Sequence, residues 1–306
     1  MSTLSPYSTH FFDESSNNSS WSNMYPYIAD GSRVLDVGCS TGNFGAALEK
    51  LKGCTVVGVD LNAADVAEAA KRISEAFVLD ITVEGVAEKL GTFDVVVFAD
   101  VIEHLPDPRA TLRAVHSLLN PGGRVVYSIP HMGHLSVRTD MLEGRFPYTE
   151  IGLLDRTHLH FYDRGEINDV FRAGGFRIVE ENPIDLGYPA EWTSERLGRL
   201  GLTTSPAFFE MLRQTEANVY QYVGLAVPAT DAPAVPSGPR EQLSTPDEYL
   251  AHAGRVIAEN KRLQRELDEL RARLRSILRN PIGSIPREIR SLLSRRKGQS
   301  ADDSTG

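Results

Sequence analysis

A glycine-containing turn follows the first apolar run of the chain, and it carries an acidic residue. Asp36, Gly38 and Gly42 are spaced D-x-G-x-x-x-G where a predicted helix begins. A backbone can approach a nucleotide-like ligand closely only where side chains are missing, so the turn predicts a ligand site at the carboxyl end of a strand. The spacing differs from the G-x-G-x-x-G of dinucleotide sites, and the Asp36 carboxylate would repel a pyrophosphate. That carboxylate could instead organise the loop or help to bind a cationic ligand that bears an amino acid.

A second acidic residue, Asp60, directly follows the apolar run 56–59. A carboxylate at the end of the second strand can accept hydrogen bonds from both ribose hydroxyls of a nucleoside that lies over the first turn. The alternative role is a helix N-cap, for which Asn62 is better placed. Asp60 is therefore predicted to bind ribose.

A third apolar run, residues 93–99, ends in a group of polar residues. This run delivers Ala99 and Asp100 to the same edge of the predicted sheet, and the pair Glu103 and His104 follows at once. His104 is either a general base or a residue that organises the loop.

In this order, the motifs resemble those of the class I S-adenosylmethionine (SAM)-dependent methyltransferases over about residues 20–180. Residues 93–108 are similar to the "evleHlpdp" segment of the ubiquinone- and menaquinone-biosynthesis type, whereas Ser40 departs from the commonest pattern, which has glycine there. The resemblance implies that SAM is the cofactor, that Asp80 bonds the adenine amino group and that Ile81 packs on the ring. An ordinary turn aspartate is the alternative for Asp80. The residues expected at the cofactor are Asp36, Gly38, Cys39, Gly42, Asp60, Leu61, Asp80, Ile81, Ala99 and Asp100.

A histidine-bearing segment, residues 152–163, is expected to decide the methyl acceptor. It looks like the "DRTHLRFF" stretch of bacterial methyltransferases associated with polysaccharide biosynthesis, which implies O-methylation of a sugar or glycan, in a polysaccharide or glycolipid. His158 is the predicted base, because a neutral imidazole can take a hydroxyl proton when a carboxylate, here Asp155 or Asp163, orients it. His104 is the second candidate.

Other interpretations of the same residues stay open. His158 could be a structural histidine, or the acceptor could be a small aromatic or quinone-like molecule in an enclosed apolar pocket built from residues 189–215. A non-catalytic scaffold of the same fold is a further alternative. A metal held by His158 and His160 would need a third ligand, so no metal site is predicted.

Short apolar runs alternate with helical patterns from Arg33 onward, which is typical of βαβ units and a parallel sheet. The resemblance implies a Rossmann-like α/β fold with seven strands, of which the last is inserted antiparallel, and helices on both faces. Strands are expected at about 33–38, 55–60, 76–80, 94–99, 124–130, 176–183 and 219–227. Helices are expected near 43–52, 63–74, 84–90, 108–119 and 163–174, and residues 131–162 are expected to form a long connection.

The chain divides by composition into a methyltransferase domain and an appendage. The domain is expected over residues 1–227, with a core at about 30–183 and a helical insert at 189–215. A Pro/Ala-rich linker is expected at 228–242. It is followed by an a/d heptad pattern at 243–280 and by a basic amphipathic segment with a polar tail at 281–306.

The heptad pattern predicts a parallel coiled coil, and hence a homodimer, because Asn260 falls at an a position. The alternative is a single amphipathic helix that docks on its own catalytic domain. The basic segment could bind an anionic membrane surface or an acidic protein partner, and a solvated tail is the alternative.

Composition limits the classes of function. The 306 residues carry 32 Lys+Arg against 41 Asp+Glu, a net charge of −9. An acidic catalytic body argues against a nucleic-acid substrate, which needs a basic surface. Two cysteines, no apolar leader and no long apolar run favour a cytoplasmic protein, peripheral at the inner membrane if the basic segment binds lipid.

Overall fold

The computed structural model describes residues 4–5, 12, 16, 19–83, 85, 90–229 and 262, and every structural statement below concerns these residues. The chain divides into two units, Met1–Pro233 and Ala234–Gly306. The predicted coiled coil, the basic segment and all but the first two residues of the predicted linker lie outside the described residues, apart from Arg262. No helix of the described part is long and apolar enough to cross a bilayer.

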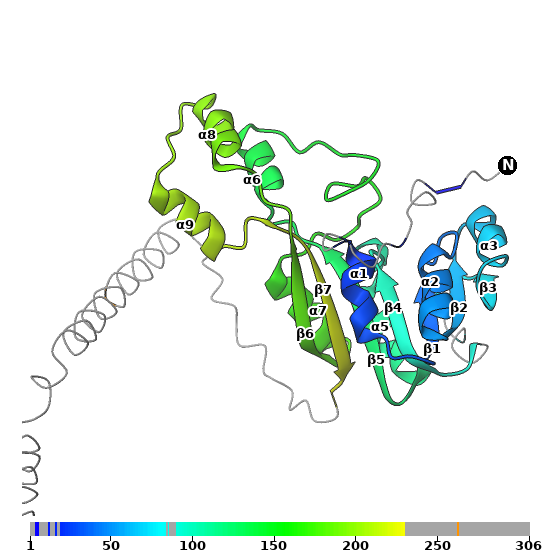
Figure 1. Cartoon of the computed structure of the whole chain (residues 1–306). Helices are drawn as coiled ribbons and strands as arrows, with labels where there is room; N and C mark the ends of the chain where they lie inside the picture. Colours follow the sequence, from blue (N-terminus) through cyan, green and yellow to red (C-terminus); the bar gives the residue numbers. More distant parts are fainter. Residues whose placement is uncertain are drawn as a thin grey trace, which may run out of the picture. The chain divides into compact units, whose positions relative to one another are not determined.

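A seven-stranded sheet forms the centre of the first unit (Figure 1), with the strand order β3-β2-β1-β4-β5-β7-β6. The strands β1 to β5 pair in parallel, whereas β7 is antiparallel to both β5 and β6. This topology confirms the predicted fold class. The strands are β1 Arg33–Val37, β2 Thr55–Asp60, β3 Glu75–Val78, β4 Phe93–Ala99, β5 Leu119–Pro130, β6 Phe176–Asp185 and β7 Val219–Pro228.

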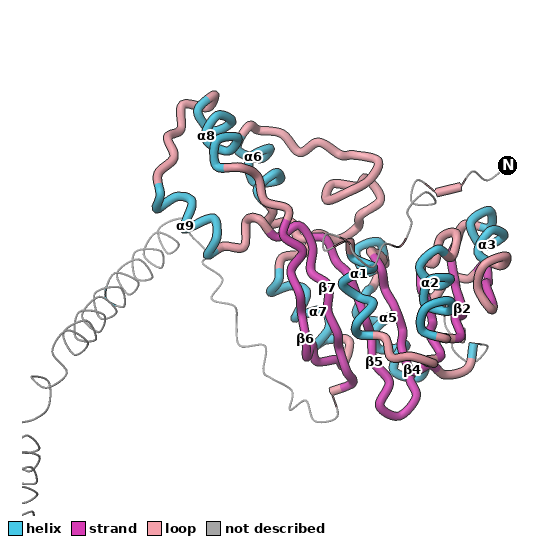
Figure 2. The backbone as a smooth tube through the Cα atoms, in the orientation of Figure 1, coloured by secondary structure: helices cyan, strands magenta, loops and turns pink. Residues whose placement is uncertain are grey.

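The helices drawn in Figure 2 include two whose extent differs from the expected ranges. The helix expected at 63–74 ends at Ala69, and the one expected at 108–119 continues as a 3₁₀ turn after Val115. The helix expected at 84–90 lies outside the described residues except for Gly85 and Leu90. The α-helices are α1 Ser20–Met24, α2 Asn43–Lys52, α3 Ala63–Ala69, α5 Pro108–Val115, α6 Leu135–Leu142, α7 Arg164–Ala173, α8 Ala190–Gly198 and α9 Pro206–Gln214, and the 3₁₀ turns are η2 Tyr25–Tyr27, η3 Ile102–His104 and η4 His116–Leu118.

Both faces of the sheet are covered, because the inner strands are apolar on both sides. In β1, Leu35 and Val37 face a core cluster that includes side chains of α5 and α7. Val34 faces the other cluster, which includes side chains of α1, α2 and α3. Strands that are buried on both faces appear in sequence as continuous apolar runs, which is why the sequence located them.

Helix α6 lies within the segment 131–162 that was expected to be a connection. Its Leu135 and Val137 are buried, whereas Met141 and Leu142 are exposed. Apolar residues therefore occur on all sides of this helix, so the sequence carries no helical periodicity to reveal it. We call residues 131–162 and 186–217, which include α6, α8 and α9, the cap; its helices stand beyond one end of the sheet in Figures 1 and 2.

Candidate functional site

A cavity of about 920 Å³ opens at the carboxyl ends of β1, β2 and β4. Of the ten residues expected at the cofactor, all but Gly42 line it. Gly42 lies instead at the N-terminus of α2, where its φ of +74° and its contact with Ala69 require the missing side chain. The carboxyl edge of a parallel sheet thus collects these side chains, as expected for an α/β fold.

The glycine turn has a strained and closely packed backbone. Gly38 has a φ of +72°, and a Cβ added there would lie 2.6 Å from Cγ2 of Val101. Ser40 also has a positive φ, +45°, and its N–H donates to Oδ2 of Asp60 over 2.9 Å. The residue that departs from the commonest family pattern therefore adopts the left-handed backbone that glycine favours.

Gly38→Ala is expected to lower the melting temperature more than Gly53→Ala does. Both positions have positive φ, which costs an alanine about 1 kcal/mol, but a Cβ on Gly53 meets nothing within 4 Å. The overlap with Val101 adds roughly 1–3 kcal/mol of overpacking at Gly38 alone. Thermal unfolding followed by circular dichroism measures the difference, and equal melting temperatures for the two variants would contradict this account.

Asp60 and Asp80 are both held by backbone at the strand ends. Asp60 accepts from the N–H of Ser40 and, over 2.8 Å, from the N–H of Asn62. Asn62 itself caps α3, so Asp60 is not the N-cap. Asp80 accepts through Oδ1 from the N–H and the hydroxyl of Thr82 over 2.9 and 2.7 Å, which is the turn role that was its alternative.

Asp36 is 2% exposed and lies at the same end of the cavity. Burial, and then the charge of Asp60, raise the pKa of Asp36 to about 7. A cationic group nearby would favour its ionised form. Together with the Asp60 carboxylate, which could also accept hydrogen bonds from ribose hydroxyls, Asp36 fits SAM, because SAM carries both a ribose and positive charge.

Asp100 lies farther along the cavity and has a φ of +56°. Its Oδ1 accepts from the hydroxyl of Ser128 over 3.1 Å and from the side-chain amide of Gln221. Burial raises the pKa of Asp100 to about 6, against these two hydrogen bonds, which lower it.

Glu103 is the most unusual group of the cavity. It is 1% exposed, and neither carboxyl oxygen has a hydrogen-bond partner among the described residues. Burial first, and then the charge of Asp100, raise the pKa of Glu103 well above its usual value. The buried hydroxyl of Tyr162 likewise has no partner in the described part. Such groups mark the place of a proton, a water molecule or an ion.

His158 faces Glu103 from the cap. Its Nδ1 lies 3.2 Å from the carbonyl oxygen of Leu153, so Nδ1 carries the proton and Nε2 carries the lone pair. Nε2 lies 3.9 Å from Oε1 of Glu103, and the ring of His104 meets that of His158 edge-on with centroids 4.7 Å apart. Burial first, and then His104, lower the pKa of His158. The ring is therefore neutral at pH 7 and can accept a proton at Nε2.

Neither acid expected to orient His158 bonds to Nδ1 of its ring. Asp155 accepts from the N–H and hydroxyl of Thr157 over 2.8 and 2.6 Å, and it acts on His158 by raising its pKa through charge. Asp163 caps α7. The Leu153 carbonyl sets the tautomer instead, because the turn after Gly152 returns the loop to that point.

Glu103, His104 and His158 form the group among the described residues that could hold a metal ion, with ligand atoms all within 4.8 Å of one another. His160, which the sequence paired with His158, bonds instead through Nε2 to the carbonyl of Leu105 over 3.0 Å. Two of the three candidate ligands, Glu103 and His104, therefore come from η3, on a separate motif.

Several cavity residues had no signal in the sequence. Tyr220 and Gln221 come from β7, and Trp21 comes from α1. They reach the cavity only because β7 pairs with β5 across the sheet and α1 packs on the cluster beneath it. A search for motifs near the strand ends could not find them, since each lies in an ordinary apolar or polar run.

The sequence matches the family described as Methyltransferase domain over residues 16–181, more than half of the chain. The ubiquinone biosynthesis O-methyltransferase of Pseudomonas syringae pv. tomato is 41% identical over 103 residues, which cover 32% of this chain and 44% of that protein. The enzyme of the same name from Pseudomonas aeruginosa is 40% identical over the same shares. The chain therefore matches less than half of the length of these relatives.

Solved structures with a similar fold include a SAM-dependent methyltransferase from Archaeoglobus fulgidus, at 19% identity and a TM-score of 0.48 over 69% of this chain and 94% of that one. Another is magnesium protoporphyrin IX methyltransferase from Synechocystis with bound SAH, at 18% identity and a TM-score of 0.46 over 69% and 83%. The family match, together with the sheet order and the residues gathered at the edge of the sheet, shows that the chain belongs to the class I SAM-dependent methyltransferases.

Proposed function

We propose that the protein is a SAM-dependent O-methyltransferase whose acceptor is a hydroxyl on a small aromatic or quinone-like molecule. The observation that carries this proposal is the single cavity that runs from the glycine turn to His158. The relatives named ubiquinone biosynthesis O-methyltransferase support the same acceptor class.

Apolar side chains form much of the wall of the cavity. The apolar lining of the cavity includes Leu105, Pro106, Pro130, Ile151 and Tyr220. Such walls suit a planar ring, while a few convergent polar groups fix its orientation. The enclosed pocket expected from residues 189–215 is not how the cavity is built, because its lining includes no residue of that range.

When bound, SAM supplies an electrophilic sulfonium methyl group. Asp60 would hold its ribose, Asp80 and Ile81 its adenine, and Asp36 its amino-acid part. His158 would take the acceptor's hydroxyl proton at Nε2 as the oxygen forms its bond to the methyl carbon in line. The methyl–sulfur bond would break in the same step, with S-adenosylhomocysteine as the neutral leaving group. Buried Glu103 lies 3.9 Å from this nitrogen. The imidazolium that forms would favour the ionised form of the Glu103 carboxyl, which would in turn stabilise the imidazolium.

Sugar and glycan acceptors, which the segment 152–163 suggested, are the competing class. Homodimerisation through 243–280 and a membrane or acidic partner for 281–306 are proposals that rest on sequence alone.

The test is a transfer assay with methyl-labelled SAM and the purified full-length chain. Catechols and hydroxyquinols are offered alongside monosaccharides, nucleotide sugars and lipid-linked glycans. We expect label on a ring hydroxyl, and none with Asp60→Ala at low SAM concentration. Label on sugars alone would replace the aromatic acceptor by the glycan class, and no transfer to any acceptor, with SAM bound, would contradict the proposal.

A further inference from the structure

Part of the cavity wall, which we call the acceptor wall, lies on a loop whose first residues are exposed. Ile151, Gly152 and His158, which line the cavity, lie on the loop between α6 and α7. The far end of this loop is tied to η3, because the N–H groups of Leu159 and His160 donate to the Glu103 carbonyl over 2.9 and 3.1 Å. The near end, residues 144–150, is exposed throughout.

The middle of the loop folds back on itself. The N–H of Thr149 donates to the Leu154 carbonyl over 2.8 Å, and the N–H of Arg156 donates to the Thr149 carbonyl over 3.0 Å. Leu153 and Leu154 pack on Val137 of α6. The position of the wall thus follows the position of α6.

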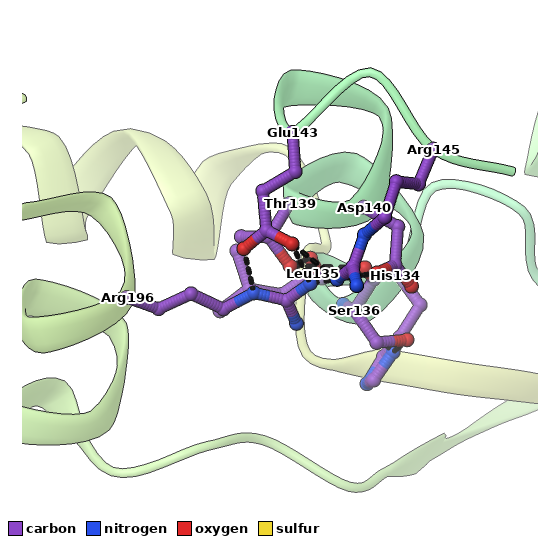
Figure 3. Close-up of polar contacts among 8 residues, drawn as sticks. All are labelled: His134, Leu135, Ser136, Thr139, Asp140, Glu143, Arg145 and Arg196. Carbon is purple, nitrogen blue, oxygen red and sulfur yellow. Dashed lines mark hydrogen bonds and ion pairs between the residues drawn. The ribbon is translucent and has the colours of Figure 1, made fainter. Parts of the chain in front are cut away.

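The C-terminal end of α6 is held by charge rather than by apolar packing. Met141 and Leu142 are exposed there, at 61% and 59%. Arg196 of α8 donates through Nε to Glu143 over 2.7 Å and through its terminal nitrogen to Asp140 over 2.7 Å (Figure 3). Arg145, the third residue after α6, bonds to both of the same carboxylates. The guanidinium of Arg196 therefore lies at the point where the loop leaves the helix.

Arg196 is itself fixed on α8. Its side chain is 16% exposed, and its guanidinium lies 5.2 Å from the ring centroid of Trp192. Trp192 stacks on Tyr188 with centroids 3.9 Å apart. A planar fork that binds two carboxylates and is backed by an aromatic pair defines a geometry that a flexible ammonium group cannot reproduce.

We propose that Arg196 is a positioning residue for the methyl acceptor, acting through α6 on the loop that carries Ile151, Gly152 and His158. This inference rests on the proposed function for its kinetic readout, but not for its structural one. SAM binding should be independent of Arg196, because the described SAM-facing residues Asp36, Asp60 and Asp80 lie outside the cap.

The test compares Arg196→Ala with Arg199→Ala in the full-length chain. Arg199 directly follows the same helix and bonds to Glu195 alone of the described residues. It is 73% exposed, so its replacement changes the charge equally without touching α6. For Arg196→Ala we expect amide exchange in residues 143–155 to accelerate at least about tenfold, KM for the acceptor to rise about tenfold, and Kd for SAM to stay the same. For Arg199→Ala we expect none of these changes.

Arg196→Lys and Glu143→Gln keep the test decisive if Arg196→Ala does not fold. Lysine keeps the charge but lacks the two separate nitrogens with which the planar guanidinium contacts Glu143 and Asp140. We therefore expect it to restore the exchange rate of residues 143–155 only in part. Unchanged exchange and KM in folded Arg196 variants, or equal effects in Arg199→Ala, would overturn the inference. If the parent enzyme transfers no methyl group, the proposed function fails, while the exchange measurement still decides the role of Arg196.

Discussion

Asp60→Ala is expected to weaken SAM binding by roughly 10²–10⁴-fold. The ribose would lose two hydrogen bonds to a charged acceptor, each contributing about 1.5–3 kcal/mol, and the glycine turn would lose the bond from the Ser40 N–H. Isothermal titration calorimetry with SAM measures the change.

Asp60→Asn is the matched control, since it keeps one acceptor oxygen and the size of the side chain. We expect it to bind with intermediate affinity. An unchanged Kd for Asp60→Ala would mean that Asp60 only shapes the turn, and the ribose would then need another partner.

His158→Ala should lower kcat by roughly 10²–10⁴-fold, the usual contribution of a positioned general base, while SAM affinity stays unchanged. His104→Ala removes the neighbouring ring but leaves the Nε2 lone pair of His158 in place, so it should lower kcat by less. Single-turnover assays with labelled SAM separate the two. Assays in the presence and absence of a chelator show whether a metal ion at Glu103, His104 and His158 contributes.

The pH dependence gives an independent check on His158. The neutral form is the active one, and burial lowers its pKa below the usual 6.5. Activity should therefore be constant around neutral pH and fall as the pH drops below about 6.5. An activity limb above that pH, or one that persists in His158→Ala, would assign the proton to another group.

The gathering of the expected cofactor residues at one cavity could be predicted because these residues lie at or just after the ends of parallel strands. Asp60 and Asp100 both come directly after a run that is apolar on both faces, and parallel strands place such ends along one edge. No contact between distant segments had to be known. The same reasoning could not show that Gly42 caps α2 and does not line the cavity. The N-terminus of that helix lies next to the cavity, so the sequence does not separate the two positions.

The acceptor half could not be predicted in the same way. Helix α6 shows no periodicity, and the tautomer of His158 depends on a backbone carbonyl, which no side-chain pattern reveals. Asp155 was expected to orient His158 because it is near in sequence. Its Oδ1 instead accepts hydrogen bonds from the N–H and the hydroxyl of Thr157 in the same turn. Tertiary contacts between motifs, such as that of Glu103 with His158, decide this part of the site.

The antiparallel insertion of β7 has a consequence for how the enzyme is made. Residues 36–104 supply the predicted cofactor side chains early in synthesis, but Asp100 bonds to Gln221, and β5 pairs with β7 over residues that lie about a hundred positions later. Pairings so distant in sequence form late in folding. A nascent chain therefore acquires its cofactor residues well before it has a closed acceptor wall, and the complete cavity exists only once the last strand has left the ribosome and entered the sheet.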